Sequence, residues 1–170
     1  MAAIEQVVAS ALLGMSAVTA IVGGAGGVPS GSSSSSSTAS PASPARIRSE
    51  HFEVGDGLDG ADAILIETDQ SEDEPDLSGL GGLPITGLTI TCRSGTIAGA
   101  TALAQAVKHN GTTPGTGLAG YHLVVAGPPS QTFDIVYESS ACAHTPRQDA
   151  SERHFNDEVL TFTVINDEPV

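Results

Sequence analysis

The stretch that most constrains the fold covers residues 88–110 and has the pattern of a strand, a tight turn and a helix. Apolar and polar residues alternate from Leu88 to Arg93, which is the period of a strand with one buried face. Ser94-Gly95 is a turn signal. Apolar residues then recur at helical spacing, at Ile97, Ala100, Leu103, Ala104 and Val107. The pattern predicts an alanine-rich helix that packs closely on a sheet, capped by Thr96 or Ser94 and ended by Asn110-Gly111.

The flanking sequence predicts further helices and strands. Residues 3–13 carry apolar side chains at spacings of three and four, and a short helical turn follows with Ser16 as its N-cap. Strand-like runs occupy residues 46–54, 63–68, 85–92, 121–126, 133–138 and 159–165. The runs at 121–126 and 133–138 can form a hairpin with a five-residue loop. Residues 139–156 are predicted to be a polar loop. The order predicts an α+β fold: a mostly antiparallel sheet of about five strands with two helices on one face.

One domain, residues 1–170, accounts for the length and for a hydrophobic content of 39%. Residues 23–45 are rich in Gly, Ser and Pro, which predicts a flexible insert or arm. The predicted core combines the apolar faces of the helices and strands: Ile4, Val8, Leu12, Ile64, Ile66, Leu88, Ile90, Ile97, Leu103, Val107, Leu160, Phe162 and Val164.

The formal charge of −14 argues against a tight grip on nucleic acid, which needs Lys and Arg to neutralise phosphates. Eleven of the 20 acidic residues lie between Glu50 and Asp76. An acidic wall repels phosphate and would suit a channel through which DNA passes without sticking. Solubility alone is the simpler explanation of the charge.

The two cysteines, Cys92 and Cys142, fall in or near predicted strands, so we expect buried thiols in a reducing compartment, with a disulfide left open. Residues 7–27 are apolar, but no Lys or Arg precedes them and glycines interrupt them. This argues against a signal peptide or a membrane span and favours a soluble, cytoplasmic protein.

Each sequence motif that could indicate a catalytic, metal-binding or cofactor-binding site has a simpler structural explanation. The Gly pattern at 115–120 follows a helix and precedes a strand, the reverse of a dinucleotide-binding loop, so we interpret it as a flexible loop. Asp56, Asp59 and Asp62 lack the alternate spacing and distant Glu of a calcium loop. The five His residues show no zinc-binding spacing. Ser94 lies between a strand and a helix but lacks the flanking glycines of a nucleophile elbow. We therefore predict no catalytic residue, cofactor or metal site.

The layout resembles a known family, the tail terminator proteins of long-tailed bacteriophages related to the lambda minor tail protein U. The likeness is carried by IEQVVASALLGMSAVTAIVG followed by RIRSEHFEV, by ADAILIETDQ, by LTITCRSGTIAGATALAQAVKH and by HFNDEVLTFTVINDE. It spans nearly all of the chain except the 23–45 insert. It rests on layout and short patterns rather than on an invariant catalytic signature.

The resemblance implies a structural virion protein of the phage neck rather than an enzyme. Such proteins assemble in the host cytoplasm as a homohexameric ring that caps the tail tube, ends its polymerisation and meets the head-completion or connector protein. Genomic DNA passes through the lumen without specific binding, and no membrane is involved. The candidate subunit or partner contacts lie in the acidic stretch and the Ser-rich arm: Glu72, Asp73, Glu74, Asp76, Ser32 and Ser37.

Two alternatives stay open. The chain could be another neck component, such as a head-completion or head–tail joining protein. It could also be a small non-viral enzyme or binding domain, which a monomeric state and a well-formed pocket would favour.

Overall fold

The computed structural model describes residues 4–23, 45–49, 51–53, 56, 61–69, 72–73, 84–110, 116–125, 131–144 and 155–167. In chain order the elements are α1 (Ile4–Leu13), α2 (Ser16–Val22), β1 (Ile47–Arg48), β2 (Ala63–Thr68), β3 (Glu72–Asp73), β4 (Pro84–Ser94), α3 (Ile97–His109), β5 (Tyr121–Val125), β6 (Gln131–His144) and β7 (Asn156–Asp167). The predicted insert lies outside the described residues, except for Gly23 and Ala45 at its two ends.

The strands form one seven-stranded sheet in the order β1-β2-β4-β7-β6-β5, with β3 pairing beside β4. Only β1 and β2 run parallel, and every other pair is antiparallel. The predicted α+β class is therefore confirmed. The number of strands is larger than the predicted five, partly because β3 has only two residues and is too short to show a period-2 pattern. The predicted strand at 46–54 is mostly wrong: it forms only the two-residue β1, and the described residues that follow, 49 and 51–53, are not in a strand.

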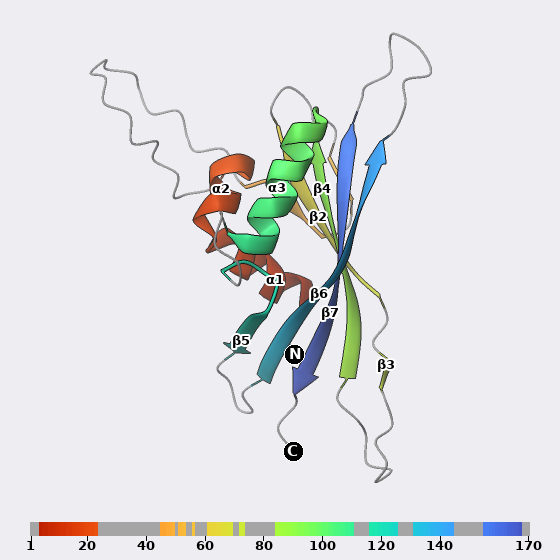
Figure 1. Cartoon of the computed structure of the whole chain (residues 1–170). Coiled ribbons are helices and arrows are strands. Elements are labelled where there is room, and N and C mark those ends of the chain that lie inside the picture. Colours follow the sequence, from red (N-terminus) through yellow and green to blue (C-terminus); the bar gives the residue numbers. More distant parts are fainter. Residues whose placement is uncertain are drawn as a thin grey trace, which may run out of the picture.

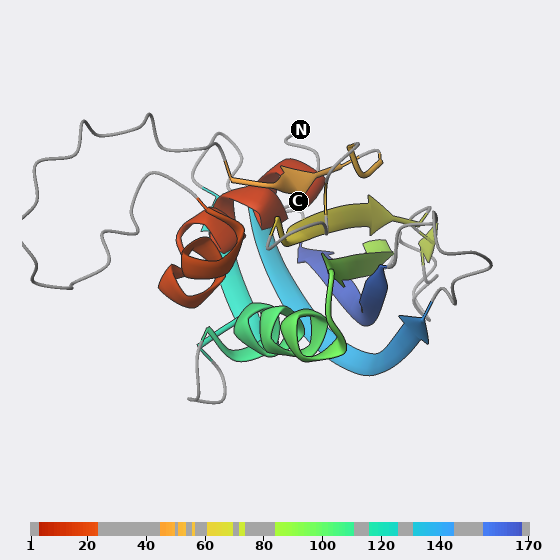
Figure 2. The same ribbon diagram turned by 90° about the horizontal axis from the view of Figure 1, so that it is seen from above.

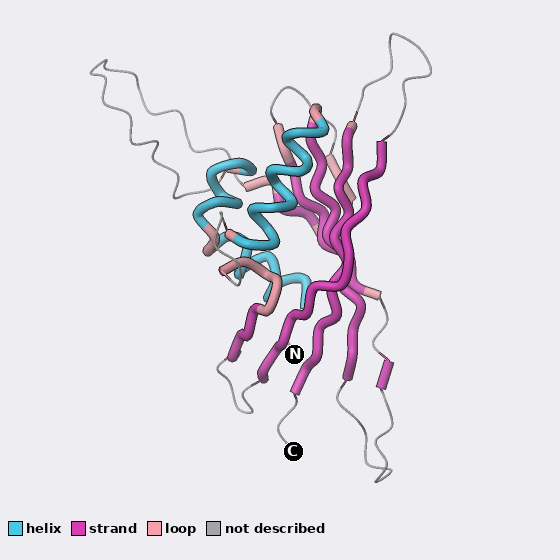
Figure 3. Tube along the Cα trace, viewed as in Figure 1, coloured by secondary structure: helices cyan, strands magenta, loops and turns pink. Residues whose placement is uncertain are grey.

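All three helices lie on the same side of the sheet, as Figures 1 and 2 show from two directions. The sheet is strongly twisted, so in the view of Figure 3 its strands cross one another at mid-height and point in different directions above and below. One face of the sheet is thus covered by helices, and we call the other the far face.

The helix-side face is built from rows of opposed residues that run across the strands. Ile66, Ile90 and Leu160 form one row, and Leu88, Phe162 and Tyr137 form a part of the next. Most members are fully buried, together with Val8, Leu12, Leu103 and Val107 of the helices. The core therefore lies between the helices and the rows of β2, β4 and β7.

Two predicted core residues depart from this pattern. Ile97 is 62% exposed, because it begins α3 and lies about 20° beyond Ala104 on the helical wheel, at the margin of the buried face. Ile4 is half-buried and packs against the cluster from the first turn of α1. The remaining predicted core side chains are buried.

The predicted capping residues are correct for α3 and wrong for α2. Thr96 caps α3 by accepting a hydrogen bond from Gly99 N at 3.0 Å, and Asn110 ends the helix in the left-handed conformation. The predicted cap of α2 is wrong: Ser16 is the first helical residue, and Met15 precedes it without a side-chain cap. Asn110 Oδ1 instead accepts a hydrogen bond from Ala17 N at 3.2 Å. The end of one helix thus caps the start of another.

Residues 116–120 are held against α3 and β6 by their backbone. Leu118 N and Ala119 N donate to the carbonyls of Val107 and Lys108, Gly120 N donates to Ile135 O, and the Leu118 side chain is fully buried. A Cβ atom at Gly117 would lie 2.4 Å from the backbone of Lys108 and His109, so only glycine fits there. This segment follows a helix and precedes a strand, as the sequence predicted. The predicted flexible loop is wrong for residues 116–120, because these hydrogen bonds and the buried Leu118 side chain fix them in place.

The long β6–β7 hairpin corrects the predicted polar loop at 139–156. Strand β6 continues to His144 and β7 begins at Asn156, with a register shift between Tyr137 and Ser139. Small and polar residues hid this extension, because residues 139–144 lack the apolar alternation by which a half-buried strand is recognised.

Candidate assembly surface

Strand β6 has a paired strand on both of its sides along only part of its length. Strand β5 pairs with residues 131–135, whereas β7 pairs with β6 from Thr132 to His144. From 136 to 144 no described strand lies on the outer side of β6, and we call these residues the open half of β6. The side chains of residues 138–143 are all exposed. Unpaired backbone N–H and C=O groups along such an edge can pair with another chain.

One strand inward from this edge lies a buried carboxylate. Glu158 of β7 stands opposite Cys92 of β4 on one side and opposite Cys142 of β6 on the other, so all three side chains share the helix-side face. The Glu158 residue is 7% exposed, and its Oε2 atom has no hydrogen-bond partner. Cys92 is fully buried, and burial together with the carboxylates of Glu158 and Asp157 raises the pKa of its thiol well above the usual range.

The thiols correct the expectation of two buried cysteines. Both are free, and Cys142 is exposed because no described side chain covers the helix-side face of β6 at that point. A strand separates the two residues, and neighbouring strands lie about 4.8 Å apart, so Cys92 and Cys142 are too distant for a disulfide.

The opposite margin of the sheet carries a hollow of about 340 Å³ between α1 and the two strands at that edge. It is lined by Glu5, Gln6, Ala9, Ile47, Arg48, Ser49 and Ile66. Strand β1 pairs only with Ile64 and Leu65 and then bends away at Ser49. The end of β2 is held instead by a hydrogen bond from Thr68 to Glu5 of α1. This margin is short and partly closed by α1.

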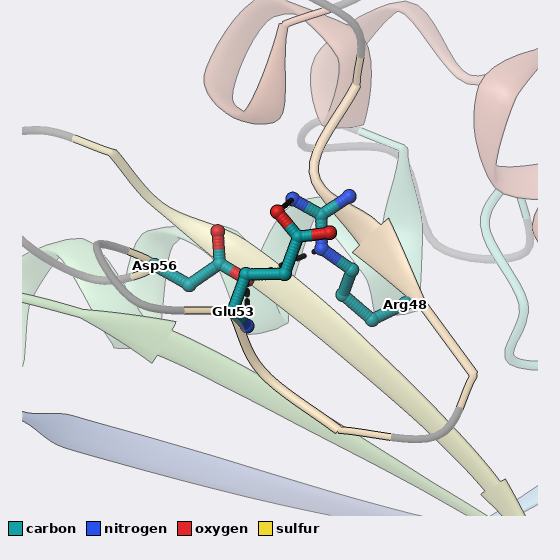
Figure 4. A network of polar contacts seen from close by, with 3 residues as sticks. All are labelled: Arg48, Glu53 and Asp56. Atoms are coloured by element: carbon teal, nitrogen blue, oxygen red, sulfur yellow. Dashed lines mark hydrogen bonds and ion pairs between the residues drawn. The ribbon is translucent and has the colours of Figure 1, made fainter.

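A polar network next to this hollow holds the segment after β1. Arg48 Nη2 donates to Glu53 Oε2 at 3.0 Å, and Arg48 Nε donates to Asp56 Oδ2 at 3.3 Å (Figure 4). The same Asp56 oxygen accepts from Glu53 N at 2.9 Å, and Asp56 is 4% exposed. Asp56 is therefore engaged by its own chain, which agrees with a turn role rather than a calcium ligand.

The far face carries a second arginine cluster. Arg93 makes two hydrogen bonds with Asp157, at 2.8 and 2.7 Å, and its guanidinium lies 3.9 Å from the centroid of the Phe52 ring and 4.7 Å from that of Phe155. Bidentate pairing and ring stacking are the interactions that suit arginine over lysine. This cluster joins β4, β7 and the segment after β1, and it satisfies the charge of Arg93.

Most of the predicted subunit or partner contact residues lie outside the residues that the structure describes. Glu72 and Asp73 form β3, whose backbone pairs with Ile85 and Pro84 of β4. Glu74, Asp76, Ser32 and Ser37 lie outside the described residues. The open half of β6 and Glu158 were missed by the sequence analysis, because an unpartnered atom is recognised only once its neighbours are placed.

Within the described ranges, no group of three His, Cys, Asp or Glu side chains could hold a metal ion. In the same ranges no single helix is long and apolar enough to cross a membrane; α1 and α2 meet that criterion only as a pair bent by 91°.

Comparisons with known proteins show a likeness of fold. Neither a protein-family model nor a curated protein matches the chain. Among solved structures, the chain is similar to one from the "Virion of native gene transfer agent (GTA) particle", with a TM-score of 0.51 and 12% identity. The match covers 97% of this chain and 96% of that chain. The two chains therefore share a fold over nearly their whole lengths.

Proposed function

We propose that this chain is a structural virion protein of a bacteriophage neck, where it forms a ring that caps the tail tube, ends its polymerisation and joins it to the head connector. The observation that carries the proposal is the fold likeness, which covers nearly all of both chains and involves a component of a virion particle. The resemblance of the sequence to tail terminator proteins points the same way. Both likenesses concern the whole layout rather than a catalytic motif.

The sheet supports an assembly role because its two margins are different. One ends in the open half of β6, and the other carries the short strand β1 and the hollow beside α1. A closed ring needs contacts in which the front of one subunit meets the back of the next. Two unlike margins on one sheet can supply such a front and back.

The charge also fits a channel protein. Each subunit carries a formal charge of −14, so a ring of six would present a strongly acidic surface to passing DNA. Phosphates are repelled by such a surface, and Arg48 and Arg93, which could otherwise attract them, are paired with carboxylates of the same chain. Genomic DNA would then cross the lumen without specific binding.

The test is the mass of the purified full chain in solution, followed by negative-stain images with tail tubes and with head connectors. Six-fold rings, or caps at one end of each tube, are the expected result. Binding to connectors but never to tubes would favour a head-completion protein instead. A monomer that binds neither tubes nor connectors would contradict a neck function.

A further inference from the structure

The structure buries a carboxylate oxygen without giving it a donor. Among the residues that the structure describes, Glu158 Oε2 has no hydrogen-bond partner, although Glu158 is only 7% exposed. An ionised oxygen removed from water without a compensating hydrogen bond is among the most costly groups to bury. A donor supplied from outside the chain would remove that cost.

None of the four described Lys and Arg residues is placed to serve as this donor. Arg46 directly precedes β1, at the opposite margin of the sheet. Arg93 is bound by Asp157 on the far face, and Arg48 is bound by Glu53 and Asp56. The Lys108 ammonium lies 4.0 Å from the centroid of the Tyr137 ring. Hydrogen bonding with Ser140, and then Lys108, lowers the pKa of the Tyr137 hydroxyl, so that lysine is also engaged.

The approach to Glu158 is open from the side of β6. Across the row, Cys92 closes one side of the carboxylate and is fully buried, while Cys142 on the other side is small and exposed. Beyond Cys142 the sheet ends at an unpaired edge among the described residues. Residues 138–144 read ESSACAH and contain none of the Pro or Lys residues that commonly protect an edge from a further strand.

We propose that the open half of β6 accepts an extended segment of a partner protein as an added strand, and that a Lys or Arg of this segment reaches across Cys142 to Glu158. Strands lie about 4.8 Å apart, so a long cationic side chain can span the single intervening strand. The partner segment is basic, since Glu138 in the open half of β6 is also acidic and exposed.

A second copy of the chain is a poor source of such a segment, because it has six Lys and Arg residues against 20 acidic ones. The inference rests on the proposed function only for the identity of the donor, a neighbouring virion protein. Strand addition at this edge can be tested with the protein alone, so a failure to form rings would leave it untouched.

The first experiment measures the affinity of the full chain for a fluorescent eight-residue peptide of alternating Thr and Val with one central Arg. Replacing the Arg by Gln, or making Glu158→Gln, should each weaken binding about tenfold or more, as expected for a charge-assisted hydrogen bond. The two changes together should weaken it little further, because they remove the same contact. Equal affinity for the Arg and Gln peptides would overturn the proposal.

Matched variants separate this contact from general charge and from folding. Asp134→Asn removes an exposed acid from the paired half of β6 and should change the affinity less than about twofold. Glu158→Gln should fold with an equal or higher melting temperature, because it removes a buried unpaired charge. Arg147 and Arg153 are the remaining cations of the chain. Replacing both by Gln tests whether the chain itself supplies the donor, and this double variant should leave the affinity for the peptide unchanged. A rise in affinity would show that the chain itself supplies the donor and would overturn the partner assignment.

The second experiment uses the native thiol of Cys142 to read the register of the added strand. Peptides carrying one Cys, activated as a mixed disulfide, are offered to the protein, and attack by the Cys142 thiolate releases the leaving thiol. The yield should peak at one peptide position and be absent in Cys142→Ser. Yields independent of position would mean that no strand is added. Self-association abolished by Glu158→Gln, without any peptide binding, would assign the edge to a second copy and overturn the proposal.

Discussion

The two halves of β6 share one strand and one partner, β7, yet they differ in almost every other respect. Residues 132–135 pair with β7 on one side and β5 on the other, and Phe133 and Ile135 are buried at 2% exposure. Within the part of the chain that the structure describes, residues 136–144 pair with β7 alone, and from 138 to 143 every side chain is exposed. The hydrogen-bonded pairing of β6 with β7 thus runs through both halves, but only the first half also contributes buried side chains to the core. The halves therefore differ both in side-chain burial and in the presence of β5 on the outer side.

The largest effect that this comparison predicts is at Phe133. Phe133→Ala should lower the free energy of unfolding by about 3–5 kcal/mol, because it removes a large side chain from the core and leaves a cavity. The matched change in the open half, Ala141→Ser, should stay within about 0.5 kcal/mol. Urea unfolding of both variants measures this. Similar losses for the two would show that the halves are equally important for stability.

The next effect concerns the segment that packs behind the paired half. Gly117→Ala should cost about 1–3 kcal/mol, since its Cβ would overlap the backbone of Lys108 and His109 at 2.4 Å. Gly120→Ala is the companion variant: it has open space but a φ of +78°, so a smaller cost of about 1–2 kcal/mol follows from backbone conformation alone. Thermal unfolding compares the two. A larger loss for Gly120→Ala would mean that the contact of Gly117 relaxes easily.

A third effect distinguishes the two thiols that flank Glu158. Burial raises the pKa of Cys92 in the folded state, so the unfolded chain releases this proton first as the pH rises. Stability from this group is complete below about pH 9 and then falls by up to about 1.4 kcal/mol per pH unit.

Urea unfolding under reducing conditions at pH 8, 9 and 10 checks this third prediction. Wild-type protein should lose stability across the series, and Cys92→Val should lose less. Cys142→Ser should behave as wild type, because that thiol is exposed in both states. Parallel curves for wild type and Cys92→Val would contradict the assignment.

Much of the paired region could be predicted from the sequence, because its signals are local. Strand β2 has the predicted bounds, α3 has the predicted Thr96 cap and Asn110 end, and the β5–β6 hairpin leaves the predicted five-residue connection. In each case apolar period or capping chemistry is written within a few neighbouring residues.

The candidate surface could not be predicted, since its features depend on residues far apart in the chain. The extension of β6 to His144 is held by pairing with β7 rather than by apolar alternation, and the row of Cys92, Glu158 and Cys142 exists only once three strands are in register. The cap of α2 by Asn110 comes from 93 residues away. The predicted burial of Ile97 is wrong, because the helical spacing of apolar residues does not show where α3 moves away from the sheet.

The smallest expected effect tests whether exposed polar contacts contribute to the stability of the paired half. His122 of β5 and Asp134 of β6 are joined by a hydrogen bond, 2.6 Å between Nδ1 and Oδ1, with side chains 61% and 52% exposed. Solvent screens such a pair, so Asp134→Asn should change the free energy of unfolding by less than about 0.5 kcal/mol. Urea unfolding at two salt concentrations measures it. A loss above about 2 kcal/mol would mean that a surface contact, and not the burial of Phe133 and Ile135, makes this half of β6 stable.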